Sequence, residues 1–459
     1  MRLINNALTG ALAAQAGLHT TSQNVANAMT EGYTRQGVVL ASVQPARGGH
    51  YAAGDGVQVA RLIRFSDNYK SQQMWAAASS LGQRSVSQPY LTQLEQVMGN
   101  DNASINKGLD EFFGALNAAS VEPSSGPLRQ QVVVAADALA KRINSVQTLF
   151  ATQRSAVYQQ RSALVDQVNE YTKAIAKLNR EIVSSYSSGI NASGLMDERD
   201  RKIDQLAKIV GIQVMDQPNG ARSIALRGGQ PLVVGDTAST MQVSMTPLGT
   251  QEVSLVFGNE TFKLAPGSNI GGEMGGLDDF EIKTLNVMRD AIRDLAFEIS
   301  DRFNSTLAGG FKPDGTPGTP LFVFDPTSAT NLLSITPGFV EDDLAFSANA
   351  AQPGNSDNLQ VLLGIRNQAV PITGLGSTLL GDAYTQLVGR LGMDSQQNQA
   401  QLETAETVRL QAEASWKSTS GVNQDEEAIA LMQYQQMYQA NMKVIAVAGE
   451  LFDATLASI

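Results

Sequence analysis

The stretch SQNVANAMTEGYTRQ, residues 22–36, lies where a long helical pattern at the N-terminus stops. Upstream of it, apolar or small residues repeat every seven positions at two places in the heptad: Ile4, Ala11, Leu18 and Val25, and Ala7, Ala14, Thr21 and Ala28. An alanine-rich seam of this kind predicts a helix that packs closely against a second helix. Within the stretch, Asn24, Asn27 and Gly32 are residue types that end helices and form turns. The sequence therefore predicts a long N-terminal helix followed by a sharp turn.

The C-terminal segment NQDEEAIALMQYQQMYQANMKVIAVAGELFDATLASI, residues 423–459, predicts a second long helix. Asn423 is a favourable N-cap, and Glu426 can complete a capping box with it. An apolar residue recurs every seven positions, and further apolar residues broaden the stripe: Leu431, Tyr438, Ile445 and Phe452, with Tyr434 and Leu451 beside them. A helix of about 30 residues spans roughly 45–50 Å.

Both terminal helices carry apolar stripes that one copy of the chain cannot cover. Ordering the backbone of some 30 residues costs more free energy than the burial of a few apolar side chains against a single helix returns. We therefore expect both terminal helices to be weakly ordered in a single copy and to become fixed between neighbouring copies. A contact of this kind, repeated from copy to copy, builds a helical tube.

Between the two ends, the pattern changes several times. Two β-rich runs near residues 35–64 predict a hairpin, and helical patterns cover 67–99, 104–120, 127–188 and 196–210. Short β-rich runs separated by turn residues occupy 211–265, a helix is expected from about Asp278 to Leu307, and helices resume near residue 380.

This order predicts a mainly α fold with a small antiparallel β-domain, in an elongated molecule. We expect the N- and C-terminal helices to pair as a coiled coil, a nested helical layer to follow, and the β-insertion to lie at the outer end. The expected domains are a terminal coiled-coil domain, a helical middle domain that includes the hairpin, and the β-domain: residues 1–32 with 422–459, residues 33–210 with 277–421, and residues 211–276.

Composition narrows the possible classes of function. The chain has 459 residues, a net charge of -11 and a pI of about 4.8, so it lacks the basic footprint of a nucleic-acid or anionic-membrane protein. It contains no cysteine, which removes disulfides and thiolate chemistry. Polar residues interrupt the N-terminal apolar run, so we expect no cleaved signal peptide and no membrane span.

Residues with catalytic chemistry are sparse. His19 and His50 are the only histidines, and neither a phosphate-binding GxxxxGK[ST] motif nor a GxSxG motif occurs. The alternating charges of MDERDRK, residues 196–202, predict a solvated, salt-bridged helix face. We expect no enzyme activity, no metal and no cofactor.

Motifs at both ends resemble those of bacterial flagellar axial proteins. SQNVAN at 22–27 followed by GYTRQ at 32–36 is similar to the N-terminal signature that rod and hook proteins share. SGVNQDEE at 420–427, YQQ at 434–436, YQAN at 438–441 and LFD at 451–453 resemble the C-terminus of the hook-associated protein 1 family, the hook–filament junction proteins. Two departures stand out: Gln424 replaces a usually apolar residue, and the segment between Phe324 and Leu333 is short where larger members insert a further outer domain.

The resemblance implies a structural adaptor of the bacterial flagellum, a ring that joins hook to filament and allows the filament to assemble. It implies an extracellular location, reached through the flagellar type III export channel. The implied partners are further copies of the chain, the hook protein, the second hook–filament junction protein and an export chaperone that binds the C-terminal helix.

The residues expected to matter fall into three sets. The N-terminal assembly helix contributes Ile4, Leu8, Ala11, Leu18 and Val25. The joint between the terminal helices and the next layer contributes Asn24, Asn27, Gly32, Tyr33 and Arg35, unless these form only an ordinary helix stop. The C-terminal helix, for assembly and chaperone binding, contributes Asn423, Glu426, Leu431, Tyr434, Tyr438, Asn441, Ile445, Leu451 and Phe452.

Three other readings stay open. The chain could be a rod or hook protein, which the matches at 420–427 and 451–453 disfavour. It could be an extracellular enzyme carried on a helical axial scaffold, which would need a carboxylate pair or metal cluster within 211–265. It could be a cytoplasmic helical scaffold, which would not need paired terminal motifs.

Overall fold

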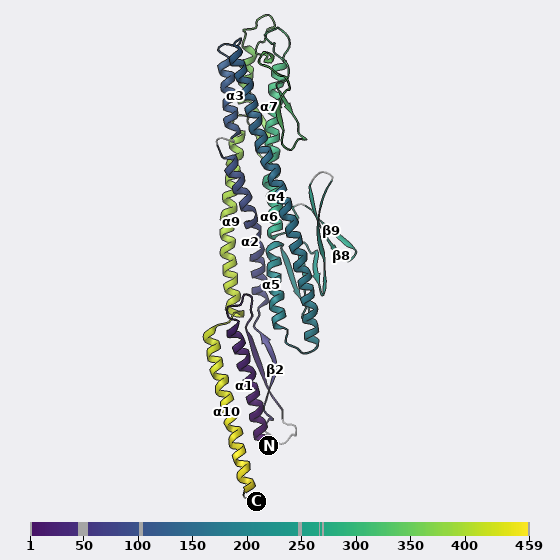
Figure 1. The fold of residues 1–459 in the computed structure, drawn as a ribbon, viewed down its shortest axis with the longest axis vertical. Helices are drawn as coiled ribbons and strands as arrows, with labels where there is room; N and C mark the ends of the chain where they lie inside the picture. Colours follow the sequence, from purple (N-terminus) through teal and green to yellow (C-terminus); the bar gives the residue numbers. More distant parts are fainter. Residues whose placement is uncertain are drawn as a thin grey trace.

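The computed structural model describes residues 2–44, 54–100, 104–246, 250–265, 267–268 and 270–457. It is strongly elongated, and both ends of the chain lie at the same extremity (Figure 1). His50 and Ile459 lie outside the described residues. The long helices that set this shape are α1 (Arg2–Ala26), α2 (Asn68–Met98), α4 (Gly126–Ser187), α7 (Asn286–Ala308), α9 (Ala383–Ser420) and α10 (Gln424–Ala457). The mainly α architecture with small antiparallel sheets agrees with the prediction from sequence.

The two terminal helices form their own layer at one end. α1 and α10 pack on each other, and they run in opposite directions because α10 starts where α1 ends (Figure 1). Beside them lies the hairpin of β1 (Gln36–Ser42) and β2 (Val57–Arg64), paired antiparallel from Gln36↔Arg64 to Ser42↔Val57. This layer meets the rest of the molecule at the end of α9 and the start of α2.

The body of the molecule is a bundle of long helices. α2 packs along α9, and α4 runs beside α7 with α3 (Ile105–Ala119) against its first half (Figure 1). α4 has 62 residues, which corresponds to about 93 Å at 1.5 Å per residue. Buried apolar residues occur along nearly all of it, from Val132 to Ile182. One helix therefore carries the chain from the outer end back to the terminal layer.

The helix after the β-domain begins earlier than expected. α6 (Gly272–Phe280) starts six residues before Asp278 and passes into α7 through a short π-helical turn, Glu281–Leu285. We expected the glycines of GGEMGGL to precede the helix. Gly271 is the N-cap, and the other three glycines lie within the helix. They allow the helix to pack against α2 with almost no space between: a Cβ on Gly276 would overlap the backbone oxygen of Gln83.

The region predicted as a β-domain forms two antiparallel sheets. One has the order β3-β4-β5-β6 and the other β7-β8-β9. Their strands are β3 (Ile212–Asp216), β4 (Arg222–Leu226), β5 (Pro231–Val234), β6 (Thr237–Ala238), β7 (Thr240–Met245), β8 (Gln251–Phe257) and β9 (Glu260–Leu264).

The position of these sheets differs from the expectation that they lie at the outer end. β8 and β9 project sideways near the middle of the long axis (Figure 1). The reason is the length of α4, which returns the chain to the terminal side before α5 (Ser193–Ile209) and the first strand begin.

The outer end is built instead from α3, the end of α7 and the segment that follows α7 (Figure 1). Its core contains an aromatic cluster in which the Phe112 ring lies 4.9 Å from Phe303 and 6.0 Å from Phe322. The segment after α7 forms two small hairpins and a short helix that the sequence did not predict: β10 (Phe322–Phe324) with β11 (Leu333–Ile335), β12 (Ala369–Ile372) with β13 (Gly376–Leu379), and α8 (Asp357–Gly364). None of the helices in the described part of the chain is both long enough and apolar enough to cross a membrane.

Candidate functional site

The terminal helices meet in a regular antiparallel register. A Cβ placed on Gly10 would lie 2.5 Å from Asn441 Oδ1, and one placed on Gly17 would lie 2.5 Å from the Tyr434 ring. One heptad further along α1, the side chain of Asn24 contacts Glu427. The three contacts are seven residues apart on each helix. In two of them a glycine of α1 lies opposite a larger side chain of α10, and these two contacts set how closely the helices approach.

The predicted seam of α1 divides between buried small residues and exposed large ones. Ala11 is buried, as are Ala7 and Ala14, and Leu18 is half-buried. The larger members of the predicted N-terminal set are exposed, among them Leu8 at 47% and Ile4 and Val25 at similar values. Small residues thus mediate the contact within one chain, and the large apolar residues face outwards.

α10 is divided differently, because large residues lie on its half-buried side as well as on its exposed side. Tyr434 and Asn441 face α1 and are half-buried, as are Leu431 and Ile445. Tyr438 is exposed, and Leu451 and Phe452 near the free end are exposed at 60% and 61%. The predicted C-terminal residues are therefore together on one helix, but only some of them contact α1.

Asn24 is the centre of the joint and is buried. Its Nδ2 donates to the Gln36 carbonyl oxygen at 2.8 Å and to Glu427 Oε2 at 3.0 Å. Its Oδ1 accepts from the Tyr33 hydroxyl at 2.9 Å and from the Gln36 N–H at 3.0 Å. One amide thereby ties the end of α1 to the start of β1 and to the first turn of α10.

Arg35 connects the same elements from the other side. Its Nε donates to Glu427 Oε1 at 2.6 Å, and its Nη1 donates to Glu426 Oε2 at 2.7 Å. Its backbone N–H donates to the Ser420 carbonyl oxygen at 2.8 Å, where α9 ends. Arg35 therefore fixes the break between α9 and α10 with both its side chain and its backbone.

The first turn of α10 differs in one detail from the expected capping box. Asn423 Oδ1 accepts from the Asp425 N–H at 3.0 Å, as an N-cap should. The Glu426 carboxylate, which we expected to reach back to Asn423, pairs with Arg35 instead. The charge attraction of a guanidinium outweighs a bond to a neutral N–H.

Tyr33 is held in its neutral form. Burial, together with the negative charges of Asp197 and Glu427, raises the pKa of Tyr33 to about 12. The hydroxyl consequently keeps the proton that it donates to Asn24.

Asn27 and Gly32 shape the turn itself. Asn27 Nδ2 donates to the Gln23 carbonyl oxygen at 2.9 Å, so its contact is local to the end of α1. Gly32 has a φ of 72°, in the region that favours glycine, and a Cβ there would lie 2.5 Å from the Arg201 side chain. A larger residue at position 32 would strain the backbone and collide with α5.

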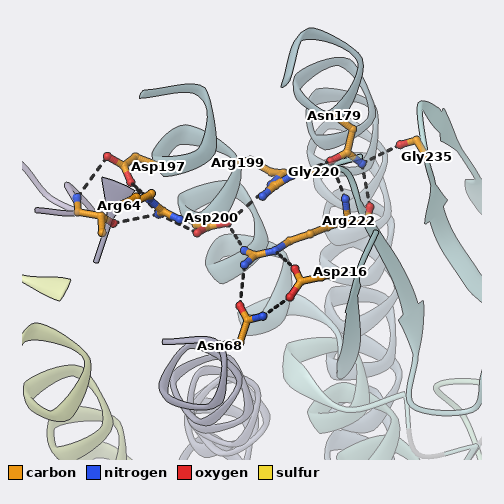
Figure 2. A network of polar contacts seen from close by, with 11 residues as sticks. Arg64, Asn68, Asn179, Asp197, Arg199, Asp200, Asp216, Gly220, Arg222 and Gly235 are labelled. Carbon is orange, nitrogen blue, oxygen red and sulfur yellow. Dashed lines mark hydrogen bonds and ion pairs between the residues drawn. The ribbon is translucent and has the colours of Figure 1, made fainter. Parts of the chain in front are cut away.

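A second polar network, which the sequence did not predict, anchors the joint to the body (Figure 2). Arg64 of β2 contacts two carboxylates of α5: its Nε donates to Asp197 Oδ1 at 2.8 Å, and its Nη2 donates to Asp200 Oδ2 at 2.9 Å. Asp197 Oδ2 also accepts the Thr34 N–H at 3.2 Å.

The network continues from Asp200 into the first sheet and α2 (Figure 2). Arg222 of β4 pairs with Asp200, donates through Nε to Asp216 at 2.7 Å and donates through Nη2 to Asn68 Oδ1 at 2.9 Å. Burial alone would raise the pKa of Asp200, but the guanidinium groups of Arg222 and Arg64 hold it below its usual value.

Arg199 links the same network to the end of α4. Its Nη1 donates to Asn179 Oδ1 at 3.2 Å and to the Gly220 carbonyl oxygen at 2.7 Å. Burial lowers the pKa of Arg199 to about 10, against the opposing effect of Asp200.

The prediction that MDERDRK forms a solvated helix face is therefore wrong for its central residues. Asp197 is 5% exposed and Arg199 is 3% exposed. One signal could have revealed this, because Arg199 continues the apolar stripe of Ile203, Leu206 and Val210 at helical spacing.

The joint shows neither a metal-binding cluster among its described residues nor an enclosed ligand pocket. Within the described residues, no group of three or more His, Asp or Glu side chains is placed to hold a metal ion. A cavity of about 440 Å³ lies at the joint, and its lining includes His19, Asn27, Tyr33 and Arg201. The joint is thus a polar mechanical connection with a hollow beside it.

Two family models match the sequence. The model described as the flagellar hook-associated protein FlgK helical domain matches residues 91–322, about half of the chain. The model described as the flagellar basal body rod FlgEFG protein C-terminal matches residues 418–458.

Similar proteins cover nearly the whole chain. The flagellar hook-associated protein 1 of Salmonella typhimurium is 25% identical over 550 aligned positions, with 99% of each chain covered. That of Bacillus subtilis is 26% identical over 485 positions, covering 97% of this chain and 95% of the relative. The solved structure of the flagellar hook junction protein FlgK from Burkholderia pseudomallei has a similar fold, with a TM-score of 0.67, 18% identity, and coverage of 76% of this chain and all of the other.

Proposed function

This chain belongs to the family of the flagellar hook-associated protein FlgK, and from that premise we propose that it is a structural adaptor between hook and filament. The family is one of structural flagellar proteins. The chain forms the ring that joins the two polymers and on which the filament assembles. A layer of this kind is needed mechanically, because hook and filament differ in curvature and stiffness.

One observation carries the proposal: α1 packs on α10 through its small residues, and both helices keep many large apolar residues exposed. Exposed apolar side chains run along both helices, from Leu8 and Leu12 on α1 to Val447, Leu451 and Phe452 on α10. Apolar surface of this extent on a soluble protein marks an interaction site. Neighbouring copies in the ring cover it.

We also propose the partners of the chain and its export route, and membership of the family supports both. The hook protein contacts the ring on the side nearer the cell, and the second junction protein contacts it on the far side. An export chaperone shields the exposed stripe of α10 before assembly, and the chain leaves through the flagellar type III channel to an extracellular location.

We assign the work of the chain to three parts. Residues 1–32 and 422–459 form the assembly layer, and residues 33–210 and 277–421 form the middle layer, whose hairpin of β1 and β2 extends beside α1. Residues 211–276 project from the side of the middle layer. The polar joint at Asn24 and Arg35 transmits the orientation of the middle layer to the assembly layer.

The rod and hook reading is less well supported. The rod-type model covers only residues 418–458, a terminal part, whereas the hook-associated relatives match from end to end.

Deletion of the gene tests the proposed function. The expected result is cells with hooks but without filaments, which release unpolymerised flagellin into the medium and recover filaments when the full chain is supplied. Normal filaments on the deletion cells would overturn the proposal.

A further inference from the structure

A groove between α4 and α7 lies away from the terminal helices and their joint. It has a volume of about 270 Å³ and is lined by Arg154 of α4 and by Arg289 and Arg293 of α7. Residues 326–329, between β10 and β11, form its rim. Arg289 and Arg293 are four residues apart, so they lie on the same face of α7.

The charge of this groove contrasts with that of the whole chain. The chain carries a net charge of -11, yet none of the described residues that line the groove is Asp or Glu. Arg289 pairs with Asp290 at 2.9 Å. Within the described residues, Arg154 and Arg293 form no ion pair with a carboxylate. Two guanidinium groups that form no ion pair among the described residues therefore line one groove.

A buried acceptor without a partner lines the same groove. Gln147 of α4 is 9% exposed, and its Oε1 accepts no hydrogen bond within the described part of the chain. A buried polar atom left in this state costs about 1–3 kcal/mol, and a ligand with an N–H group would satisfy it. The buried side chains of Phe150 and Leu285 also line the groove and give it an apolar floor.

We propose that this groove binds an acidic peptide segment of a partner protein. Carboxylates of the segment pair with Arg154, Arg289 and Arg293, since guanidinium and carboxylate form strong two-pronged hydrogen bonds. A backbone N–H of the segment donates to Gln147 Oε1, and an apolar side chain covers Phe150. An inorganic anion would meet the arginines alone, so the orphaned acceptor and the apolar floor favour a peptide.

Binding of a labelled peptide to the full-length chain tests this inference, which does not depend on the proposed function. The probe is a short blocked peptide of Glu, Asp and Leu, and its control has Gln and Asn in place of the acids. Fluorescence anisotropy should show binding of the acidic peptide that weakens as salt is added. Arg154→Gln and Arg293→Gln should each weaken binding about tenfold.

Matched variants separate the groove from general surface charge. Arg180→Gln, on the same helix but paired with Asp236 outside the groove, should change the affinity by less than about twofold. Gln147→Leu should weaken binding of the acidic peptide severalfold. It should leave the affinity of inorganic phosphate, measured by competition, unchanged. Circular dichroism verifies that each variant is folded, and Arg293→Lys, which keeps the charge, should lose less affinity than Arg293→Gln.

Three results would overturn the inference: equal binding of the Gln/Asn peptide, displacement of the acidic peptide by equimolar phosphate, or a loss in Arg180→Gln as large as that in Arg293→Gln.

Discussion

Asn24 and Glu427 are 403 residues apart in the sequence, yet Asn24 Nδ2 donates to Glu427 Oε2 across 3.0 Å in a buried position. Glu427 is only 2% exposed and has Arg35 as its second partner. This contact is the last of three heptad-spaced contacts between α1 and α10, and the only one that is polar on both sides and closed from solvent. This contact fixes α1 and α10 to each other at the joint. At the opposite tips of the two helices no buried contact of this kind is present among the described residues.

Asn24→Ala should loosen the start of α10. The substitution removes four hydrogen bonds and leaves the buried Glu427 carboxylate with one partner fewer, a cost of about 2–4 kcal/mol. Hydrogen exchange of the amides near residues 424–434 should accelerate accordingly. Asn27→Ala, which removes only local bonds, is the control and should change exchange there little. Equal effects of the two substitutions would contradict the central role of Asn24.

Gly17→Ala should separate the terminal helices. The added Cβ would lie 2.5 Å from the Tyr434 ring, and overpacking of this kind costs about 1–3 kcal/mol. In a Tyr434→Ala background the same substitution should destabilise the helix pair less. A double-mutant cycle measures this coupling from the hydrogen exchange of the α10 amides. Gly449→Ala, where nothing lies within 4 Å, should instead stabilise α10 by up to about 1 kcal/mol. Absence of coupling between positions 17 and 434 would contradict the register.

Asp200→Asn should destabilise the body in a pH-dependent way. Since Arg222 and Arg64 hold the folded pKa of Asp200 below 3.8, its charge stabilises the folded state at neutral pH, and this contribution is lost as pH falls below 3.8. At pH 7, the free energy of unfolding of Asp200→Asn should therefore be about 3 kcal/mol lower than that of the natural chain. Chemical denaturation measures this difference. The difference should shrink below pH 3.8.

Asp197→Asn is the companion to that experiment. Burial raises the pKa of Asp197 despite Arg64, so its charge contributes less to the folded state. An asparagine oxygen can still accept the Thr34 N–H. The loss at pH 7 should be smaller than for Asp200→Asn, and a larger loss would contradict the assignment of Asp200 as the centre of the network.

Leu451→Ser combined with Phe452→Ser should block assembly and leave the fold intact. Both side chains are more than half exposed in a single copy, so their loss costs the isolated chain little. In the ring their burial would contribute about 1.5–3 kcal/mol each. The variant should keep the melting curve of the natural chain but fail to restore filaments to deletion cells. Full restoration would show that this stripe is not an assembly surface.

The terminal helices could be predicted because heptad spacing and capping residues are local signals. Their register could not be predicted. The sequence marks Gly10 and Gly17 only as small residues and does not show that Asn441 and Tyr434 lie opposite them. The same limit applies to Ile4 and Val25, which the heptad spacing assigns to the seam although both are exposed. Sequence spacing identifies a stripe but does not say which copy of the chain covers it.

The contacts of the predicted joint residues are made in tertiary structure, which the sequence does not reveal. Asn24 and Arg35 lie close to the turn in sequence, while Glu427 and Ser420 arrive from the far end of the chain. The network around Asp200 was missed because alternating charges usually face water, and here strands β2 and β4 cover them. The position of the β-sheets was missed because the order of elements does not reveal that α4 spans most of the body.

Hydrogen exchange of the dilute, isolated chain shows whether its terminal helices depend on neighbouring copies. We propose that copies stack because no single copy covers the apolar residues of its two tips. The account predicts that amides of residues 3–12 and 443–457 exchange almost as fast as in an unfolded chain, while those of α4 stay protected, and that both tips gain protection when the chain adds to purified hooks. Tips as strongly protected as α4 in the isolated chain would contradict it.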